Sequence, residues 1–212
     1  MNDTQQFWKT PNIGERVHLM PPALEGTDTP LQRDYRRRCD TPSDINEHMP
    51  VLRALAAQCH VICEFGVRTG NSTIALLAGL EAGGMTAAAY CDLWSWDIQQ
   101  PQMERPVLPP WLRWNFEIGD TARLGRIPRC DLLFIDTAHT GVHVTAELQY
   151  HASVARFIVF HDTVLYGEVG MDGKPGVLVA AREFQARHHE WVEFAHHLNN
   201  NGLLVLERRS SS

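Results

Sequence analysis

The chain has 212 residues, of which 44% are apolar and 21% charged, and its formal net charge is -6. This composition excludes the disordered and fibrous classes and predicts a globular chain with the size of one α/β domain. The negative net charge provides no general attraction to phosphate backbones, so it argues against nucleic-acid substrates.

The apolar stretches and the start of the sequence indicate a cytoplasmic protein. The longest apolar stretches, such as residues 131–136, are far too short to cross a bilayer. The first residues, Met-Asn-Asp-Thr-Gln-Gln, lack the basic and apolar regions of a secretory signal. The five cysteines are odd in number and irregularly spaced, which favours reduced core thiols. We therefore expect a cytoplasmic protein without membrane contact.

Residues 1–42 are expected to form an N-terminal arm or lid ahead of one domain over residues 43–212. The arm is rich in Pro, Thr and charged residues and shows no sustained period. Its basic run, Arg33 to Arg38, is expected to be a solvated face. Aromatic residues such as Trp8 need apolar partners, which makes this arm a candidate for a homodimer contact.

The rest of the chain alternates between short apolar runs and amphipathic segments. The expected strands cover residues 61–65, 85–91, 113–118, 131–136 and 156–160. One expected helix begins near residue 44, and three others cover residues 72–80, 142–153 and 177–187. Residues 94–110 contain several Pro and Gln and predict a long functional loop. Repeated strand–helix–strand units are typical of an α/β fold with a parallel, doubly wound sheet.

The end of the chain departs from this alternation. Two apolar segments, residues 191–197 and 203–206, flank the sequence Asn199-Asn200-Asn201-Gly202. Asn and Gly tolerate the positive φ angles of tight hairpin turns. The mostly parallel sheet is therefore expected to finish in an antiparallel hairpin.

The strongest local motif is Glu64-Phe-Gly66-Val-Arg68-Thr69-Gly70-Asn-Ser72, placed between an expected strand and an expected helix. Glycines allow a sharp turn and close approach to a ligand, while the helix N-terminus offers free amide groups. Taken alone, this loop also fits a purely structural turn. A nicotinamide-binding domain needs Gly-x-Gly-x-x-Gly here, whereas this loop has only two glycines, four residues apart.

This motif resembles the acidic-x-Gly-x-x-x-Gly motif of class I methyltransferases, which use S-adenosylmethionine (SAM). The resemblance implies a seven-stranded Rossmann-like sheet. It implies SAM binding by Glu64, Gly66, Arg68, Thr69, Gly70, Ser72, Asp92, Asp120 and Thr121. Among these, Asp92 is expected to end the second strand and accept from the ribose hydroxyls. Asp120 and Thr121 are expected at the adenine edge, although both aspartates also fit turn or cap positions.

Two polar clusters, Asp136-Thr-Ala-His139 and His161-Asp162-Thr163, directly follow expected strands and should meet at the carboxyl edge of the sheet. Over about residues 44–208, the chain resembles catechol-type and macrocin-type O-methyltransferases and cephalosporin hydroxylase-like proteins. In those relatives, acidic residues here often hold a divalent cation, which implies Mg²⁺ or Mn²⁺ on Asp136 and Asp162. His161 departs from the family pattern, because imidazole favours softer ions or no metal.

If no metal binds, His139 or His161 is the candidate base, with Asp136 as the group that orients it. We therefore expect a SAM-dependent methyltransferase acting on a hydroxyl of a small-molecule acceptor: a sugar, polyketide or phenolic metabolite. Asp136, His139 and His161 are its candidate catalytic residues. One alternative is an inactive SAM- or nucleotide-binding module, against which the retained polar clusters argue. The other is an NAD-linked oxidoreductase, which the glycine spacing and the hairpin disfavour.

Overall fold

The structure is a computed structural model that describes residues 28–84 and 90–209. It contains a seven-stranded sheet in the order β3-β2-β1-β4-β5-β7-β6. The strands are β1 (Val61–Phe65), β2 (Cys91–Asp97), β3 (Leu112–Ile118), β4 (Cys130–Ile135), β5 (Val154–His161), β6 (Trp191–His197) and β7 (Leu203–Arg208). Strands β1 to β5 pair in parallel, while β7 is antiparallel to both β5 and β6. The predicted fold class is confirmed.

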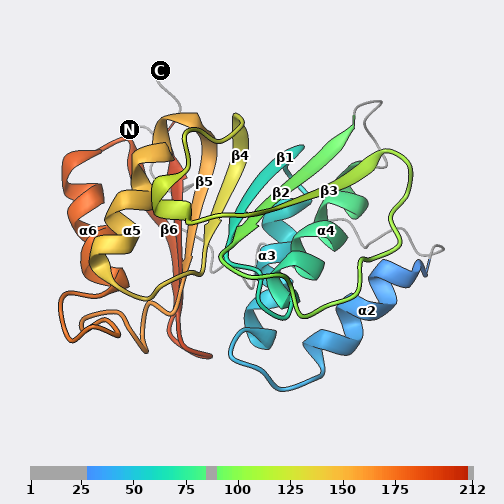
Figure 1. Cartoon of the computed structure of the whole chain (residues 1–212), viewed down its shortest axis with the longest axis horizontal. Helices are drawn as coiled ribbons and strands as arrows, with labels where there is room; N and C mark the ends of the chain where they lie inside the picture. The colour runs from blue at the N-terminus through green and yellow to red at the C-terminus, as the bar shows by residue number, and fades with distance from the viewer. Residues whose placement is uncertain (1–27, 85–89, 210–212) are drawn as a thin grey trace, which may run out of the picture.

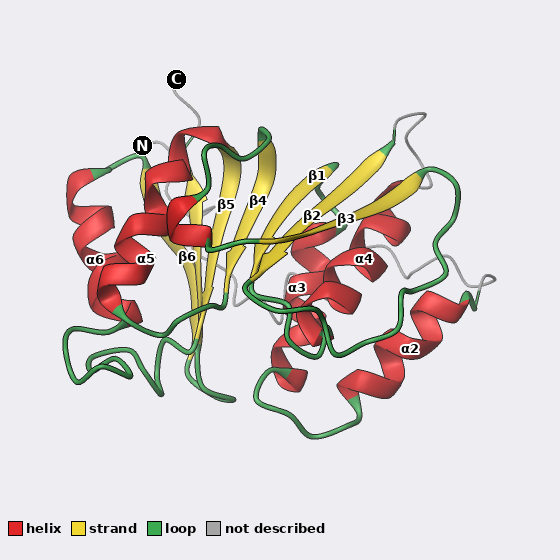
Figure 2. Ribbon diagram, in the orientation of Figure 1, coloured by secondary structure: helices red, strands yellow, loops and turns green. Residues whose placement is uncertain are grey.

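Helices cover both faces of the sheet (Figures 1 and 2). They are α2 (Pro30–Cys39), α3 (Met49–Ala56), α4 (Asn71–Gly84), α5 (Gly141–Glu147) and α6 (Val177–Arg187). Helices α2, α3 and α4 lie on one face, and α5 and α6 on the other. No helix in the described ranges combines the length and apolar character needed to cross a membrane.

Alternate residues of the central strands enter two separate apolar clusters, because successive strand side chains point to opposite faces. Ile62 and Phe134 pack in the cluster under α3 and α4. Cys63 and Leu133 pack in the cluster under α5 and α6. All five cysteines are free, and four of them are buried. This two-sided burial explains why the central strands have nearly continuous apolar sequences.

The terminal hairpin forms where the sequence predicted it. Asn200, Asn201 and Gly202 have φ angles of 43°, 70° and 93°. Asn and Gly are the residues that adopt this left-handed region most readily. The turn also contacts the segment that follows α2, because Asn200 donates from its side chain to the carbonyl of Ser43 at 2.8 Å.

The predicted second strand is wrong in its boundaries. We expected it over residues 85–91, ending at Asp92, but β2 runs from Cys91 to Asp97. Residues 85–89 lie outside the described ranges. Asp92 is therefore at the amino-terminal end of β2, where Arg113 of β3 donates to its carboxylate at 2.7 and 2.8 Å. Since parallel strands share one carboxyl edge, Asp92 lies at the edge opposite the loop that follows β1.

The predicted irregular arm contains a helix. Helix α2 begins after Thr29, whose hydroxyl accepts from the amide of Gln32 at 3.1 Å, with Pro30 in its first turn. Its only buried residue is Leu31, and the helix packs on α4. The basic run therefore lies on a packed helix. Residues 1–27, including Trp8, lie outside the described ranges, so a lid or homodimer contact stays a prediction.

Candidate active site

The loop after β1 is held by two glycines in the left-handed region. Gly66 and Gly70 have φ angles of 89° and 78°, which L-residues with side chains rarely adopt. Gly66 also lies directly against the end of β4, because a Cβ atom there would be 1.9 Å from the carbonyl oxygen of Asp136. The sharp turn expected from the glycines is present. Its close approach at Gly66 brings the ends of β1 and β4 together.

We expect Gly66→Ala to lower the free energy of unfolding by about 1–3 kcal/mol, because the new Cβ would clash with a backbone oxygen at a φ angle that strains any residue with a side chain. Gly125→Ala is the matched control, since a Cβ at Gly125 has nothing within 4 Å. Urea unfolding of both variants measures the difference. Equal stability of the two variants would mean that position 66 tolerates a side chain.

Asp97, at the carboxyl end of β2, anchors this loop. Its Oδ2 accepts from the amides of Val67 and Arg68 at 2.8 and 3.0 Å, and its Oδ1 accepts from the amide of Gln99 at 3.0 Å. Asp97 thus has the strand-end position that we expected for Asp92. The sequence contained a signal for this, because Leu93, Trp94 and Trp96 continue the strand pattern beyond residue 92.

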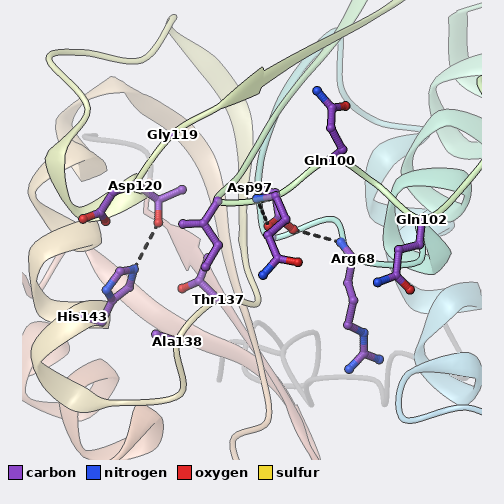
Figure 3. A pocket seen from close by; sticks show the side chains of 13 residues that line it. Arg68, Asp97, Gln100, Gln102, Gly119, Asp120, Thr137, Ala138 and His143 are labelled. Carbon is purple, nitrogen blue, oxygen red and sulfur yellow. Dashed lines mark hydrogen bonds between the residues drawn. The ribbon is translucent and has the colours of Figure 1, made fainter.

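A cavity of about 560 Å³ opens at this edge of the sheet. Four of the predicted cofactor residues line it: Gly66, Arg68, Asp120 and Thr121. Among the other residues that line it, none of which we predicted, are Asp97, Thr137, Ala138 and His143. In Figure 3, Asp97 lies between the side formed by Asp120 and His143 and the side formed by Arg68 and Gln102. The volume lies within the range of small-molecule and cofactor sites.

The remaining predicted cofactor residues lie outside the wall of this cavity. Glu64 is fully buried and accepts from the hydroxyls of Ser72, Thr73 and Ser95 at 2.7, 2.9 and 2.6 Å. It therefore ties β1, α4 and β2 together beneath the loop. Thr69 lines a second cavity of about 380 Å³, on the side of α2. Gly70 faces Met103, whose Sδ would lie 1.8 Å from an added Cβ.

Burial raises the pKa of Glu64 to about 7, although the hydroxyls of Ser95, Ser72 and Thr73 oppose this shift. The folded state therefore retains a proton that the unfolded state releases above its ordinary pKa of 4.5. Linkage then requires the free energy of unfolding to fall as pH rises between about 4.5 and 7.

We expect Glu64→Gln to remove a decline of about 3 kcal/mol across this window, because Gln does not titrate. Urea unfolding at several pH values between about 4.5 and 7 measures this. Glu168→Gln, at an exposed position, should keep the decline of the wild type. Parallel stability curves for the wild type and Glu64→Gln would contradict the role of Glu64.

Asp136, His139, His161 and Asp162 lie together, as their positions after β4 and β5 predict. His139 Nε2 is 2.9 Å from Asp162 Oδ2 and 3.3 Å from Asp136 Oδ1. His161 Nδ1 is 3.4 Å from Asp136 Oδ1 and 3.5 Å from Asp162 Oδ2. The ring of His139 stacks on Tyr166 with centroids 4.8 Å apart. We call these four residues the acid–histidine cluster.

The charges of this cluster determine its protonation. Burial disfavours the imidazolium form, but the two carboxylates outweigh it and raise the pKa of His139 to about 9 and that of His161 to about 10. Burial also opposes ionisation of the carboxyls, yet the histidines hold the pKa of Asp162 at about 2 and lower that of Asp136. At neutral pH and without another cation, both imidazoles are protonated and neither is a ready base.

Three members of the cluster fit a divalent metal ion. Asp136, His161 and Asp162 each have a ligand atom within 4.8 Å of the other two. His161 Nδ1 and Asp162 Oδ1 are buried without a hydrogen-bond partner. His161 Nε2 lies 3.1 Å from the carbonyl oxygen of Asp44, and donation to it leaves the Nδ1 lone pair free for a metal. From the sequence we expected Asp136 and Asp162 as ligands and His161 as a candidate base, and the structure places His161 with the two carboxylates as a third candidate ligand.

No protein-family model matches the sequence, and no curated protein matches it either. Solved structures do match it. An O-methyltransferase from Bacillus cereus in complex with S-adenosylhomocysteine (SAH) is 15% identical, with 93% of this chain and 97% of that chain covered and a TM-score of 0.55. The N-methyltransferase NodS from Bradyrhizobium japonicum is 12% identical, with 86% and 99% covered and a TM-score of 0.51.

A third match, the MycE methyltransferase of the mycinamycin biosynthetic pathway in complex with Mg and SAH, is 14% identical, with a TM-score of 0.55. The match covers 86% of this chain and 55% of MycE, so this chain spans about half of MycE. These matches include an O-methyltransferase and an N-methyltransferase, and this chain is similar in fold to all three enzymes. The chain has the Rossmann-like fold of the class I SAM-dependent methyltransferases.

Proposed function

We propose that this protein is a SAM-dependent methyltransferase that methylates a hydroxyl oxygen of a small molecule. One observation carries the proposal. Thr137 and Ala138 line the large cavity, and in the chain they stand directly between Asp136 and His139 of the acid–histidine cluster. A cofactor in the cavity and an acceptor at the cluster would therefore be neighbours. Such positioning supplies much of the rate of an in-line methyl transfer.

The cavity suits the nucleoside part of SAM. The carboxylate of Asp97 accepts hydrogen bonds from three backbone amides. Because an ionised carboxylate has about four lone-pair sites, it can still accept a hydrogen bond from a ribose hydroxyl. Asp120 and Thr121 line the side where we place adenine, together with His143. The complexes of the Bacillus cereus enzyme and of MycE with SAH support this choice of cofactor.

Asp136, His161 and Asp162 would hold a divalent cation. When bound, the ion supplies positive charge that favours deprotonation of the acceptor hydroxyl. Two carboxylates suit Mg²⁺, while the imidazole favours Mn²⁺, and the Mg²⁺ in the MycE complex supports a metal here. His139 is a positioning residue, since its Nε2 contacts both carboxylates. The raised pKa values of His139 and His161 favour the metal over either imidazole as the means of deprotonating the acceptor.

SAH release with paired acceptors tests this function. Phenolic, sugar and polyketide hydroxyl compounds are each compared with the same compound whose hydroxyl is already methylated. We expect SAH only with free hydroxyls, and the loss of that turnover in Asp136→Asn. Transfer to a nitrogen atom would contradict O-methylation. SAM binding without turnover across the panel would favour an inactive SAM-binding module.

A further inference from the structure

A second group of metal-binding side chains lies away from the active site. His151 belongs to the 3₁₀ segment η3 (Leu148–Ser153), while His188 and Glu190 lie between α6 and β6. Each offers a ligand atom within 4.8 Å of those of the other two. We propose that His151, His188 and Glu190 bind one Zn²⁺ ion. We call these three residues the distal site.

A hydrogen bond orients the imidazole of His151 for this task, and ring packing holds that of His188. His151 Nδ1 lies 2.8 Å from the carbonyl oxygen of Leu148, and donation to this oxygen leaves Nε2 free. Metal-binding histidines usually make such a bond with their second nitrogen, because it fixes the tautomer and the ring. Both rings also pack on Phe184, which is buried in α6, with centroid separations of 5.2 Å for His151 and 4.5 Å for His188.

The spacing of the carboxylate also fits. His188 Nδ1 and Glu190 Oε1 are 3.6 Å apart, which is longer than a hydrogen bond. Ligand atoms about 2.0–2.1 Å from a tetrahedral Zn²⁺ lie roughly 3.3–3.4 Å from each other. A small side-chain adjustment would therefore seat an ion between them. The alternative is a simple ion pair of His188 with Glu190. Such a pair does not involve His151, so it does not explain why the His151 ligand atom lies beside the other two.

The ligand set selects the type of ion. Two imidazoles and one carboxylate favour Zn²⁺ and related transition metals over Mg²⁺ or Ca²⁺, which prefer oxygen ligands. All three side chains are partly exposed, so an ion can enter and water can complete its coordination. This chemistry differs from the oxygen-rich active-site group of Asp136, His161 and Asp162.

The position of the distal site indicates a structural role. Strands β5 and β6 run in the same direction, because each pairs antiparallel with β7. The distal residues precede the starts of these two strands, whereas His161 ends β5. The eight residues of β5 separate the two sites by about 25 Å. A bound ion would therefore clamp η3 to the end of α6 and the start of β6, without touching substrate.

Zinc binding is best measured on untagged, metal-free protein in which Asp136→Asn and Asp162→Asn remove the active-site group. We expect one Zn²⁺ per chain by competition with a chromophoric chelator. At about 100-fold excess of Zn²⁺ over Kd, Tm should rise by about 5–10 °C, because the ion binds only the folded state. His151→Ala and Glu190→Gln should each weaken binding by at least about tenfold.

His189→Ala is the matched control, since His189 is exposed on the same turn but outside the distal site. It should keep both the stoichiometry and the rise in Tm. Melting without metal identifies any variant that fails to fold, and Glu190→Gln preserves side-chain size. No zinc binding in the parent protein would overturn the proposal. So would binding that His151→Ala, Glu190→Gln and His189→Ala leave equally strong.

Discussion

Asp162→Asn is expected to lower turnover by at least about 10²-fold and to remove Mg²⁺ or Mn²⁺ binding, while SAM affinity stays unchanged. A catalytic metal contributes several kcal/mol to transition-state stabilisation, and each 1.36 kcal/mol corresponds to a tenfold change in rate. Asn suits this position, because Asp162 has a φ angle of 57° and Asn tolerates the left-handed region. The variant therefore tests the carboxylate with little change in the backbone.

Asp172→Asn is the control for this experiment, because Asp172 is exposed and its carboxylate accepts from the nearby amide of Lys174. It should retain wild-type turnover. Chelation should abolish wild-type activity, and Mg²⁺ or Mn²⁺ should restore it. Full activity in a chelator, together with loss of turnover in His139→Ala, would instead identify His139 as the base and exclude the metal.

Asp97→Asn is expected to weaken SAM binding by about 10²-fold. The variant replaces a carboxylate that accepts from three loop amides, and hydrogen bonds to charged groups contribute about 1.5–3 kcal/mol each. It also changes the group that we place at the ribose. Asp92→Asn is the matched control, because Asp92 pairs with Arg113 at the opposite edge of the sheet. Calorimetry should give it wild-type affinity.

Similar SAM affinities for Asp97→Asn and the wild type would refute the placement of the ribose at Asp97. A large loss of affinity in Asp92→Asn, with an unchanged fold by circular dichroism, would favour the original assignment from the sequence. The pair of variants therefore separates two aspartates that stand at opposite ends of one strand.

Periodicity and turn chemistry were sufficient to predict most of the fold. The apolar run over residues 61–65 fixes a buried strand, and Asn199 to Gly202 fix the terminal hairpin. The second strand was misplaced because Trp94 and Trp96 precede a segment rich in Pro and Gln. We assigned both tryptophans to that loop by its composition, although they belong to the strand. That one error moved the acidic strand-end residue from Asp97 to Asp92.

Helix α2 was missed for a different reason. Among its ten residues only Leu31 is buried, so no apolar stripe reveals it. Its N-cap Thr29, the Pro30 in its first turn and the arginines in its last turn stabilise it locally. In a polar segment without an apolar stripe, such end signals are the main sequence evidence for a helix.

The candidate site was predictable in its position but not in its contacts. The acid–histidine cluster followed from strand ends that share one edge of a parallel sheet. By contrast, the burial of Glu64 depends on hydroxyls from Ser72, Thr73 and Ser95, which lie on two other elements. A sequence motif marks Glu64 as important, but only tertiary packing shows that its carboxylate faces the interior.

Calorimetric titration of the metal-free chain with SAM, and separately with NAD⁺, tests the central claim most directly. The cavity, the glycine loop and Asp97 predict that one SAM binds per chain and that NAD⁺ produces no heat beyond dilution. Binding of NAD⁺, or the absence of SAM binding by correctly folded protein, would contradict the account.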